Sequence, residues 1–310
     1  MQYFAFVFTC SPLAPCLSES FLKQTGIMAN FTSIDKLRWL APDIACEIII
    51  KATPIEAKSL LMVMRKVLSK QPVDVNVVLA NSKRKKLLVI ADMDSTIIEQ
   101  ECIDELAEAA GVGSEIRTIT EQAMQGELNF EHALVKRVRL LEGLSVTTVK
   151  HILKNRIRLM GGAVEFIQTM RQNGCYCALV SSGFTSFTSV ISRLVGFDKH
   201  QANSLEVVNG KLTGRVLNPI LNGEAKLAAL NIMLKEQRIE VSQSLAVGDG
   251  ANDLLMISHA GLGCAFRAKS ILSRSADVII QHCDLTGLLY LQGFSVDRFY
   301  SAHEHINSQV

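Results

Sequence analysis

The chain has 310 residues, of which 48% are hydrophobic and 20% are charged, a composition that is typical of a folded globular protein and excludes a disordered one. The net charge of +2, from 32 basic and 30 acidic residues, gives no electrostatic basis for binding nucleic acid or an anionic membrane. The length predicts two domains, or one large domain with an insertion.

The eight cysteines are spread along the chain. Only Cys175 and Cys177 lie close together, and no second Cys or His pair completes a metal site with them. We therefore expect buried, reduced thiols and a cytoplasmic protein. No run of residues is long and apolar enough to span a bilayer. The apolar stretch 1–10 precedes any basic residue and is followed at once by Ser11, which favours a first strand over a signal peptide.

Residues 1–80 are predicted to form a separate domain of β-α-β-β-α-β order, the ferredoxin-like arrangement. The expected elements are a strand at 3–8, a helix at 18–24, strands at 37–40 and 46–51, a helix opened by Thr53-Pro54, and a strand at 73–79. This ACT-like unit carries nothing that looks catalytic, so we expect it to serve regulation or homodimerisation. The basic stretch 80–86 is predicted to be a solvated linker, with a nucleic-acid contact as the alternative.

An apolar strand at 87–91 ends abruptly at Asp92 and Asp94. An apolar run of this kind indicates a strand buried on both faces, as in a parallel sheet covered by helices. Two carboxylates at its end need a hard cation or protonation of one of them, unless they belong to a plain polar turn. Four helices are then expected, at 98–110, 114–125, 130–141 and 145–153, which together read as a helical cap inserted after the first core strand.

The α/β pattern resumes after the cap. The expected elements are a helix at 163–172, a strand at 175–180, a helix ending at 194, a hairpin at Asn209-Gly210, a helix at 225–235, and strands at 244–247, 262–266 and 278–281. Three apolar strands of this core end in polar clusters, which are Asp92/Asp94, Ser181/Ser182 and Asp249/Asn252/Asp253. Because the carboxyl ends of parallel strands converge, these groups should share one crevice, which Lys226 could join. Such a set suits a phosphoryl group held with Mg²⁺.

The chain resembles the haloacid dehalogenase-like phosphohydrolases in four motifs, which are Asp92-Met-Asp-Ser-Thr96, Ser181 before Gly183-Phe184, Lys226, and Gly248-Asp-Gly-Ala-Asn-Asp253. The residues of the first and last motifs, together with the helical cap, are similar to those of the family members that act on phosphoserine. This resemblance covers roughly residues 86–292. The resemblance implies a doubly wound, mostly parallel α/β core made of residues 86–97 and 160–300, with the cap at 98–159.

The resemblance also implies a reaction, the hydrolysis of O-phospho-L-serine in serine biosynthesis. Asp92 would be the nucleophile that forms an aspartyl-phosphate, and Asp94 the general acid and then the base. One Mg²⁺ per active site would be held by Asp92, the backbone carbonyl of Asp94, and Asp249, with Asp253 bonded to metal-bound water or to Lys226. The phosphate would be bound by Ser181, Ser182, Gly183, Lys226 and Asn252.

Substrate selection is assigned by the resemblance to the cap. Glu101 would pair with the substrate ammonium and Arg137 with its carboxylate, while Phe130 and Met124 close over it. The residues alone also allow both side chains to be ordinary surface residues. Glu101 repeats with Glu105 and Glu108 as on a solvated helix face, and Arg137 lies in a basic stretch typical of a surface. Phe130 and Met124 could equally pack the cap interior.

Two departures from the family pattern stand out. Ser182 replaces the usual glycine, and Gly161-Gly162 stands where a proline is common. The alternatives to phosphoserine hydrolysis are a phosphatase or phosphotransferase activity on another small phosphomonoester, and a non-catalytic sensor of a phosphorylated ligand. The presence of both Asp92 and Asp94 weighs against a sensor, since a pure binder needs neither nucleophile nor acid.

Overall fold

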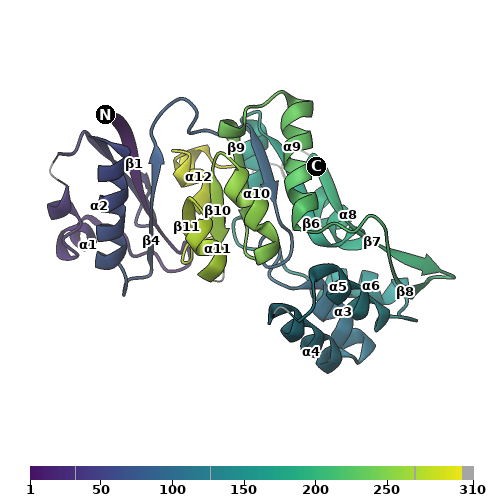
Figure 1. The fold of residues 1–310 in the computed structure, drawn as a ribbon. Helices are drawn as coiled ribbons and strands as arrows, with labels where there is room; N and C mark the ends of the chain where they lie inside the picture. Colours follow the sequence, from purple (N-terminus) through teal and green to yellow (C-terminus); the bar gives the residue numbers. More distant parts are fainter. Residues whose placement is uncertain (32, 126, 269, 302–310) are drawn as a thin grey trace, which may run out of the picture.

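The structure is a computed structural model that describes residues 1–31, 33–125, 127–268 and 270–301. The chain forms two sheets, and the helices between Cys102 and Asn155 form a separate group to one side of the larger sheet (Figure 1). Within the described ranges, none of the helices has the length and apolar character needed to cross a bilayer.

The N-terminal sheet is antiparallel, with the order β2-β3-β1-β4. Its elements in chain order are β1 (Gln2–Cys10), α1 (Glu19–Gln24), β2 (Lys36–Ala41), β3 (Ala45–Ala52), α2 (Pro54–Val67) and β4 (Val73–Leu79). This order and pairing confirm the predicted ferredoxin-like arrangement. Local signals fix the helix starts, since Thr53 forms a capping box with Glu56 and Ser18 caps α1.

Strand β1 is buried on both faces, which joins the two sheets. Phe6 and Phe8 pack with the helices of the N-terminal part, whereas Ala5 and Val7 alternate onto the opposite face and join the core under the large sheet. Figure 1 accordingly shows α2 on the outer side of the small sheet and the large sheet on its other side. The two sheets therefore share apolar packing.

The large sheet has seven strands in the order β11-β10-β9-β5-β6-β7-β8, all parallel except β8. The strands are β5 (Leu88–Ala91), β6 (Tyr176–Phe184), β7 (Lys199–Val208), β8 (Lys211–Leu217), β9 (Ser244–Gly248), β10 (Gly263–Phe266) and β11 (Val278–Ile280). The helices of this part are α7 (Ala163–Gln172), α8 (Thr185–Val195), α9 (Gly223–Gln237), α10 (Leu254–His259), α11 (Ser270–Ser275) and α12 (Gly287–Leu291).

Helices cover both faces of this sheet. In the central strand β5, Leu88 and Ile90 belong to the cluster that includes α9 and α10, while Val89 and Ala91 belong to the cluster that includes α7 and α8. The strand is fully buried, as its apolar run predicts. The predicted doubly wound, mostly parallel core is thus confirmed.

The cap consists of the helices α3 (Cys102–Ala110), α4 (Gly113–Met124), α5 (Phe130–Arg139) and α6 (Val146–Asn155), between β5 and α7 in sequence. The prediction of one helix from Ile98 was wrong at its start. Ile98 forms an antiparallel bridge with Leu159, and Glu99 N donates to Arg158 O at 3.0 Å. The two chain crossings between core and cap pair with each other, and this pairing delays the helix to Cys102.

The prediction of a solvated linker at 80–86 was wrong for two of its basic residues. The Arg84 side chain is only 10% exposed, lies 2.6 Å from the carboxylate of buried Glu47, and donates to Leu291 O at 2.8 Å. Buried Lys86 donates from Nζ to Ser242 O at 2.8 Å. Arg84 satisfies acceptors where the two sheets meet and Lys86 satisfies one just before β9, and the charge pattern alone cannot reveal such partners.

Candidate active site

The carboxyl ends of three adjacent strands meet at one edge of the large sheet. β5 lies between β9 and β6, with Ala91 level with Val247 on one side and Leu179 on the other. The chain continues from β5 into Asp92 and from β9 into Asp249, and Ser181 lies on β6 two residues after Leu179. The structure therefore brings the three polar clusters together, as expected for strand ends in a parallel sheet.

These strand ends and the cap enclose a cavity of about 1120 Å³. Ten of the predicted site residues line it, namely Asp92, Asp94, Glu101, Phe130, Arg137, Ser181, Ser182, Gly183, Asp249 and Asn252. Lys226 and Asp253 are fully buried beneath them. Met124 ends helix α4, and its side chain lies outside the described residues.

Lys226 forms a buried ion pair with two carboxylates. Its ammonium lies 2.8 Å from Asp92 Oδ1 and 2.7 Å from Asp253 Oδ1. Burial alone would lower the pKa of Lys226, but the charges of Asp253 and Asp92 more than offset this and raise it. Asp92 Oδ1 also accepts from Met93 N at 2.7 Å, so the Asp92 carboxylate is held in one orientation by a permanent cation and a backbone donor.

Three carboxylates lie close together beside this ion pair. Oxygen atoms of Asp92, Asp249 and Asp253 all lie within 4.8 Å of one another. Burial, with the charges of Asp92 and Asp253, raises the pKa of Asp249 to about 8. Burial and the charge of Asp92 raise the pKa of Asp253 to about 7. A crowded, all-oxygen donor set with excess negative charge fits a hard divalent cation.

Glycines make room for this arrangement. A Cβ on Gly248 would lie 2.3 Å from Asp253 Oδ2, and one on Gly183 would lie 2.6 Å from Asp94 Oδ2. At both places a larger residue would force the neighbouring carboxylate to move. The glycines of the two motifs are thus explained by contact with the acids.

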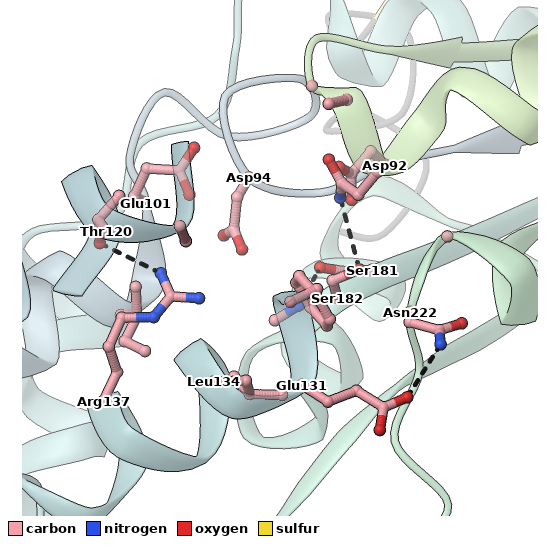
Figure 2. Close-up of a pocket in the computed structure, with 18 of the residues that line it drawn as sticks. Asp92, Asp94, Glu101, Thr120, Glu131, Leu134, Arg137, Ser181, Ser182 and Asn222 are labelled. Carbon is pink, nitrogen blue, oxygen red and sulfur yellow. Dashed lines mark hydrogen bonds between the residues drawn. The ribbon is translucent and has the colours of Figure 1, made fainter. Parts of the chain in front are cut away.

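The Asp94 carboxyl is directed into the cavity, between Glu101 and Ser182 (Figure 2). Burial raises the pKa of Asp94 well above its ordinary value, and the charges of Glu101 and Asp92 add to this. The chain turns sharply after Asp94, with Ser95 in the left-handed region at φ +54°. Ser95 Oγ donates to Glu101 Oε1 at 2.7 Å, which ties this turn to the start of the cap.

The Ser181 cluster is part of a strand and not of a loop. β6 was expected to end at Val180, but it continues to Phe184 with a register shift against β7. Buried Ser181 accepts from Gly183 N at 2.8 Å, and Ser182 Oγ accepts from Asn252 Nδ2 at 3.4 Å. The hydroxyl at the unusual Ser182 therefore contacts another predicted phosphate ligand.

The cap contributes charged side chains to the cavity. Glu101 precedes α3, so it is not one of the residues of that helix. Arg137 is half-buried, and its Nη1 donates to Thr120 Oγ1 at 3.4 Å. Burial lowers the pKa of Arg137, although the carboxylates of Asp104 and Glu101 counter this. Figure 2 shows Glu101 and Arg137 on the same side of the cavity, beside Thr120.

Sequence reasoning missed a contact between cap and core. Asn222 caps α9 by accepting from Ala225 N at 3.0 Å, and its Nδ2 donates to Glu131 Oε1 on α5 at 3.1 Å (Figure 2). Asn222 before a helix is a recognisable N-cap signal. Its second partner comes from a distant part of the chain, and no local pattern predicts it.

Comparison with known proteins finds the haloacid dehalogenase-like hydrolase family over residues 89–258. A phosphoserine phosphatase of Saccharomyces cerevisiae is 36% identical over 296 residues, which are 94% of each chain. A phosphoserine phosphatase of Archaeoglobus fulgidus is 45% identical over 205 residues, which are 66% of this chain and 59% of that protein. This chain thus spans less than two thirds of the archaeal relative.

Solved structures agree in fold. A haloacid dehalogenase family hydrolase of Salmonella enterica serovar Typhi superposes with a TM-score of 0.81 at 25% identity, over 94% of this chain and 98% of the other. A substrate-bound phosphoserine phosphatase complex superposes with a TM-score of 0.63 at 43% identity, over 66% of this chain and 98% of the other. The first similarity includes the N-terminal sheet, and the second covers about two thirds of the chain.

Proposed function

Because this chain belongs to the haloacid dehalogenase-like hydrolase family, we propose that it hydrolyses O-phospho-L-serine to L-serine and phosphate through an aspartyl-phosphate. One observation carries the proposal. Asp92, oriented by Lys226, and Asp94 face the same cavity as the cap residues Glu101 and Arg137. A nucleophile and an acid at one end, with a carboxylate and a guanidinium at the other, match a phosphorylated amino acid.

The two acids divide the reaction. In the first step an oxygen of Asp92 bonds to phosphorus, the bond from phosphorus to the serine oxygen breaks, and Asp94 gives its proton to the departing serine oxygen. In the second step Asp94 takes a proton from water while the water oxygen bonds to phosphorus. The bond from phosphorus to Asp92 then breaks, which releases phosphate and restores the free enzyme.

The groups around the acids would bind the phosphoryl oxygens. Ser181, Ser182 and Asn252 offer hydroxyl and amide donors, Gly183 leaves room for the phosphate, and Lys226 supplies positive charge beside Asp92. One Mg²⁺ per active site would be held by Asp92, Asp249 and the backbone carbonyl of Asp94, with Asp253 bonded to Lys226 behind them. When bound, the ion would offset the negative charge of the phosphoryl group.

Specificity would come from the cap. Glu101 would pair with the substrate ammonium and Arg137 with its carboxylate, and Phe130 would close over them. An aryl phosphate lacks both charged groups. Replacing Glu101 or Arg137 should therefore raise KM for phosphoserine far more than KM for an aryl phosphate.

The decisive experiment measures phosphate release with Mg²⁺ from both enantiomers of phosphoserine and from an aryl phosphate, for the wild type and Asp92→Asn. We expect turnover of phosphoserine that Asp92→Asn abolishes. Full activity of Asp92→Asn would rule out the covalent route. Binding of phosphoserine without any turnover would favour a sensor, and turnover insensitive to Glu101→Gln would favour another phosphomonoester.

The division of the chain into residues 1–80, a core of 86–97 and 160–300, and a cap of 98–159 also belongs to this proposal, supported by the two sheets and the intervening helices. Regulation or homodimerisation through residues 1–80 stays a prediction. Light scattering of the full chain, with and without L-serine, checks it. A monomeric mass together with unchanged activity in serine would contradict it.

A further inference from the structure

The segment 279–286 contacts two distant parts of the molecule. One is strand β4 of the N-terminal sheet, which Figure 1 shows beside β11 at the edge of the large sheet. The other is the place where the chain returns from the cap to the core, just before α7. The segment thus connects a part of the chain without catalytic residues to the base of the cap.

The contact with β4 is built from two polar side chains that bind backbone. Asp74 is 6% exposed and accepts three hydrogen bonds, from Gln281 N at 2.9 Å, His282 N at 3.0 Å and Cys283 N at 2.9 Å. Asn76 both accepts from Ile279 N and donates to Ile279 O, each at 2.8 Å. Hydrogen bonds to a charged acceptor are stronger than neutral ones, so Asp74 fixes three consecutive residues.

The contact with the cap's return crossing is close-packed. Gly161 O accepts from Leu285 N at 3.1 Å. Gly162 has φ +76°, and a Cβ there would lie 2.8 Å from Thr286 N and 3.0 Å from Asp284 Cγ. Asp284 in turn accepts from Thr286 N at 2.9 Å. The crossing therefore packs on a platform formed by Asp284 and Thr286. Between Gly162 and this platform there is no space for even a methyl group.

The return crossing is paired with the outgoing one. Met160 N donates to Ile97 O at 2.9 Å, and Ile98 forms an antiparallel bridge with Leu159. The outgoing crossing begins after Asp94 and ends at Glu101. The Glu101 side chain lines the cavity. A shift of the platform would therefore displace the backbone that positions this side chain.

We propose that Asp74 is a positioning residue for the cap: by anchoring residues 281–283 it fixes the platform of Asp284 and Thr286, and through the paired crossings it sets the position of Glu101. The proposal rests on the proposed function only where KM for phosphoserine is used to measure the position of Glu101. The backbone coupling itself does not depend on which substrate the enzyme uses.

The test compares Asp74→Asn, which keeps the shape but replaces one acceptor oxygen by a donor, with Asp35→Asn, the same change at an exposed site of the N-terminal part. For Asp74→Asn in the full chain with Mg²⁺, we expect KM for phosphoserine to rise about 3- to 30-fold. We expect kcat/KM for an aryl phosphate to stay within about twofold of wild type. In a Glu101→Gln background the same change should have little further effect on KM, because the interaction it disturbs is already lost.

Hydrogen exchange provides a readout independent of substrate. The amides of 157–162 should exchange faster in Asp74→Asn than in wild type and Asp35→Asn. Equal losses with both substrates, no change with either, or faster exchange confined to 279–286 would each overturn the proposal. If wild type does not turn over phosphoserine, the proposed function fails while the exchange test of Asp74 still stands. If Asp74→Asn does not fold, Thr286→Val tests the platform by the same measurements.

Discussion

The ammonium of Lys226 and the carboxylate of Asp92 lie 2.8 Å apart in a site where the lysine is completely buried. Lys226 comes from the first turn of α9, and Asp92 follows the central strand β5. The pair is stabilised because Asp253 shares the same ammonium at 2.7 Å. A buried charge of this kind is tolerated only with its partners, so each member of the group depends on the others.

Lys226→Met should therefore affect both stability and catalysis. Removing one partner of a buried pair costs about 3–5 kcal/mol of unfolding free energy. Loss of a charge that stabilises the transition state should lower kcat about 10²- to 10³-fold. Urea unfolding and steady-state kinetics measure the two effects. Lys235→Met, an exposed lysine of the same helix, is the matched control and should leave both unchanged.

Metal-free protein should lose stability as pH rises. The folded state raises the pKa of Asp249 to about 8 and of Asp253 to about 7, from an ordinary value of 3.8. These carboxyls thus keep protons in the folded state that the unfolded chain releases, so the unfolding free energy falls between about pH 4 and pH 8.

Mg²⁺ should reduce this loss, because a cation bound to the folded state stabilises it by mass action and favours the ionised carboxylates. Urea unfolding at pH 5 and pH 8, in EDTA and in Mg²⁺, measures the difference. Asp249→Asn should flatten the pH dependence in EDTA and weaken the response to Mg²⁺. An identical pH slope in EDTA and Mg²⁺ would speak against a cation at this site.

Gly183→Ala should impair catalysis more than folding. The new methyl would lie 2.6 Å from Asp94 Oδ2 and 3.0 Å from Ser181 Oγ, so the Asp94 side chain has to move. A displacement of about 1 Å in a catalytic group can cost about 10²-fold in rate. We expect a loss of that size in kcat for both phosphoserine and an aryl phosphate. A wild-type rate in the folded variant would show that Asp94 does not need its present position.

Glu131→Ala should weaken closure of the cap, since it removes the acceptor for Asn222 Nδ2 at 3.1 Å. One hydrogen bond at a partly exposed site predicts a rise of about 2- to 10-fold in KM for phosphoserine. Glu131→Gln keeps an amide oxygen that can accept the same bond and should stay close to wild type. If both variants raise KM equally, the charge of Glu131 matters and the hydrogen bond does not; if both match the wild type, neither matters.

The fold was largely predictable because its signals are local. The apolar strand before Asp92, the Thr53-Pro54 pair at a helix start, and the hairpin at Asn209-Gly210 each predict their element without help from distant residues. The helix start at Ile98 was wrong because pairing with Leu159 overrides helical preference there. That pairing joins residues far apart in sequence, and periodicity does not record it.

The site was predictable at the strand ends and less so elsewhere. Parallel topology explains why Asp92, Ser181 and Asp249 meet, whereas no sequence pattern joins Asn222 to Glu131. Half-buried Arg84 was misread because its partner Glu47 was overlooked. A single acid inside the apolar strand Ala45–Ala52 was the available signal, since a buried carboxylate requires a cation.

The two-sided burial of β1 bears on how the N-terminal part can be studied. Ala5 and Val7 share a core with residues of the large sheet, and the Glu47 carboxylate forms an ion pair with Arg84, which lies outside the small sheet. Cutting the chain before residue 86 would strip cover from that shared core and present fresh apolar surface to solvent, which invites aggregation. Truncation would therefore confound solubility with regulation. Isosteric point substitutions leave this shared core intact and are therefore the better test of what residues 1–80 do.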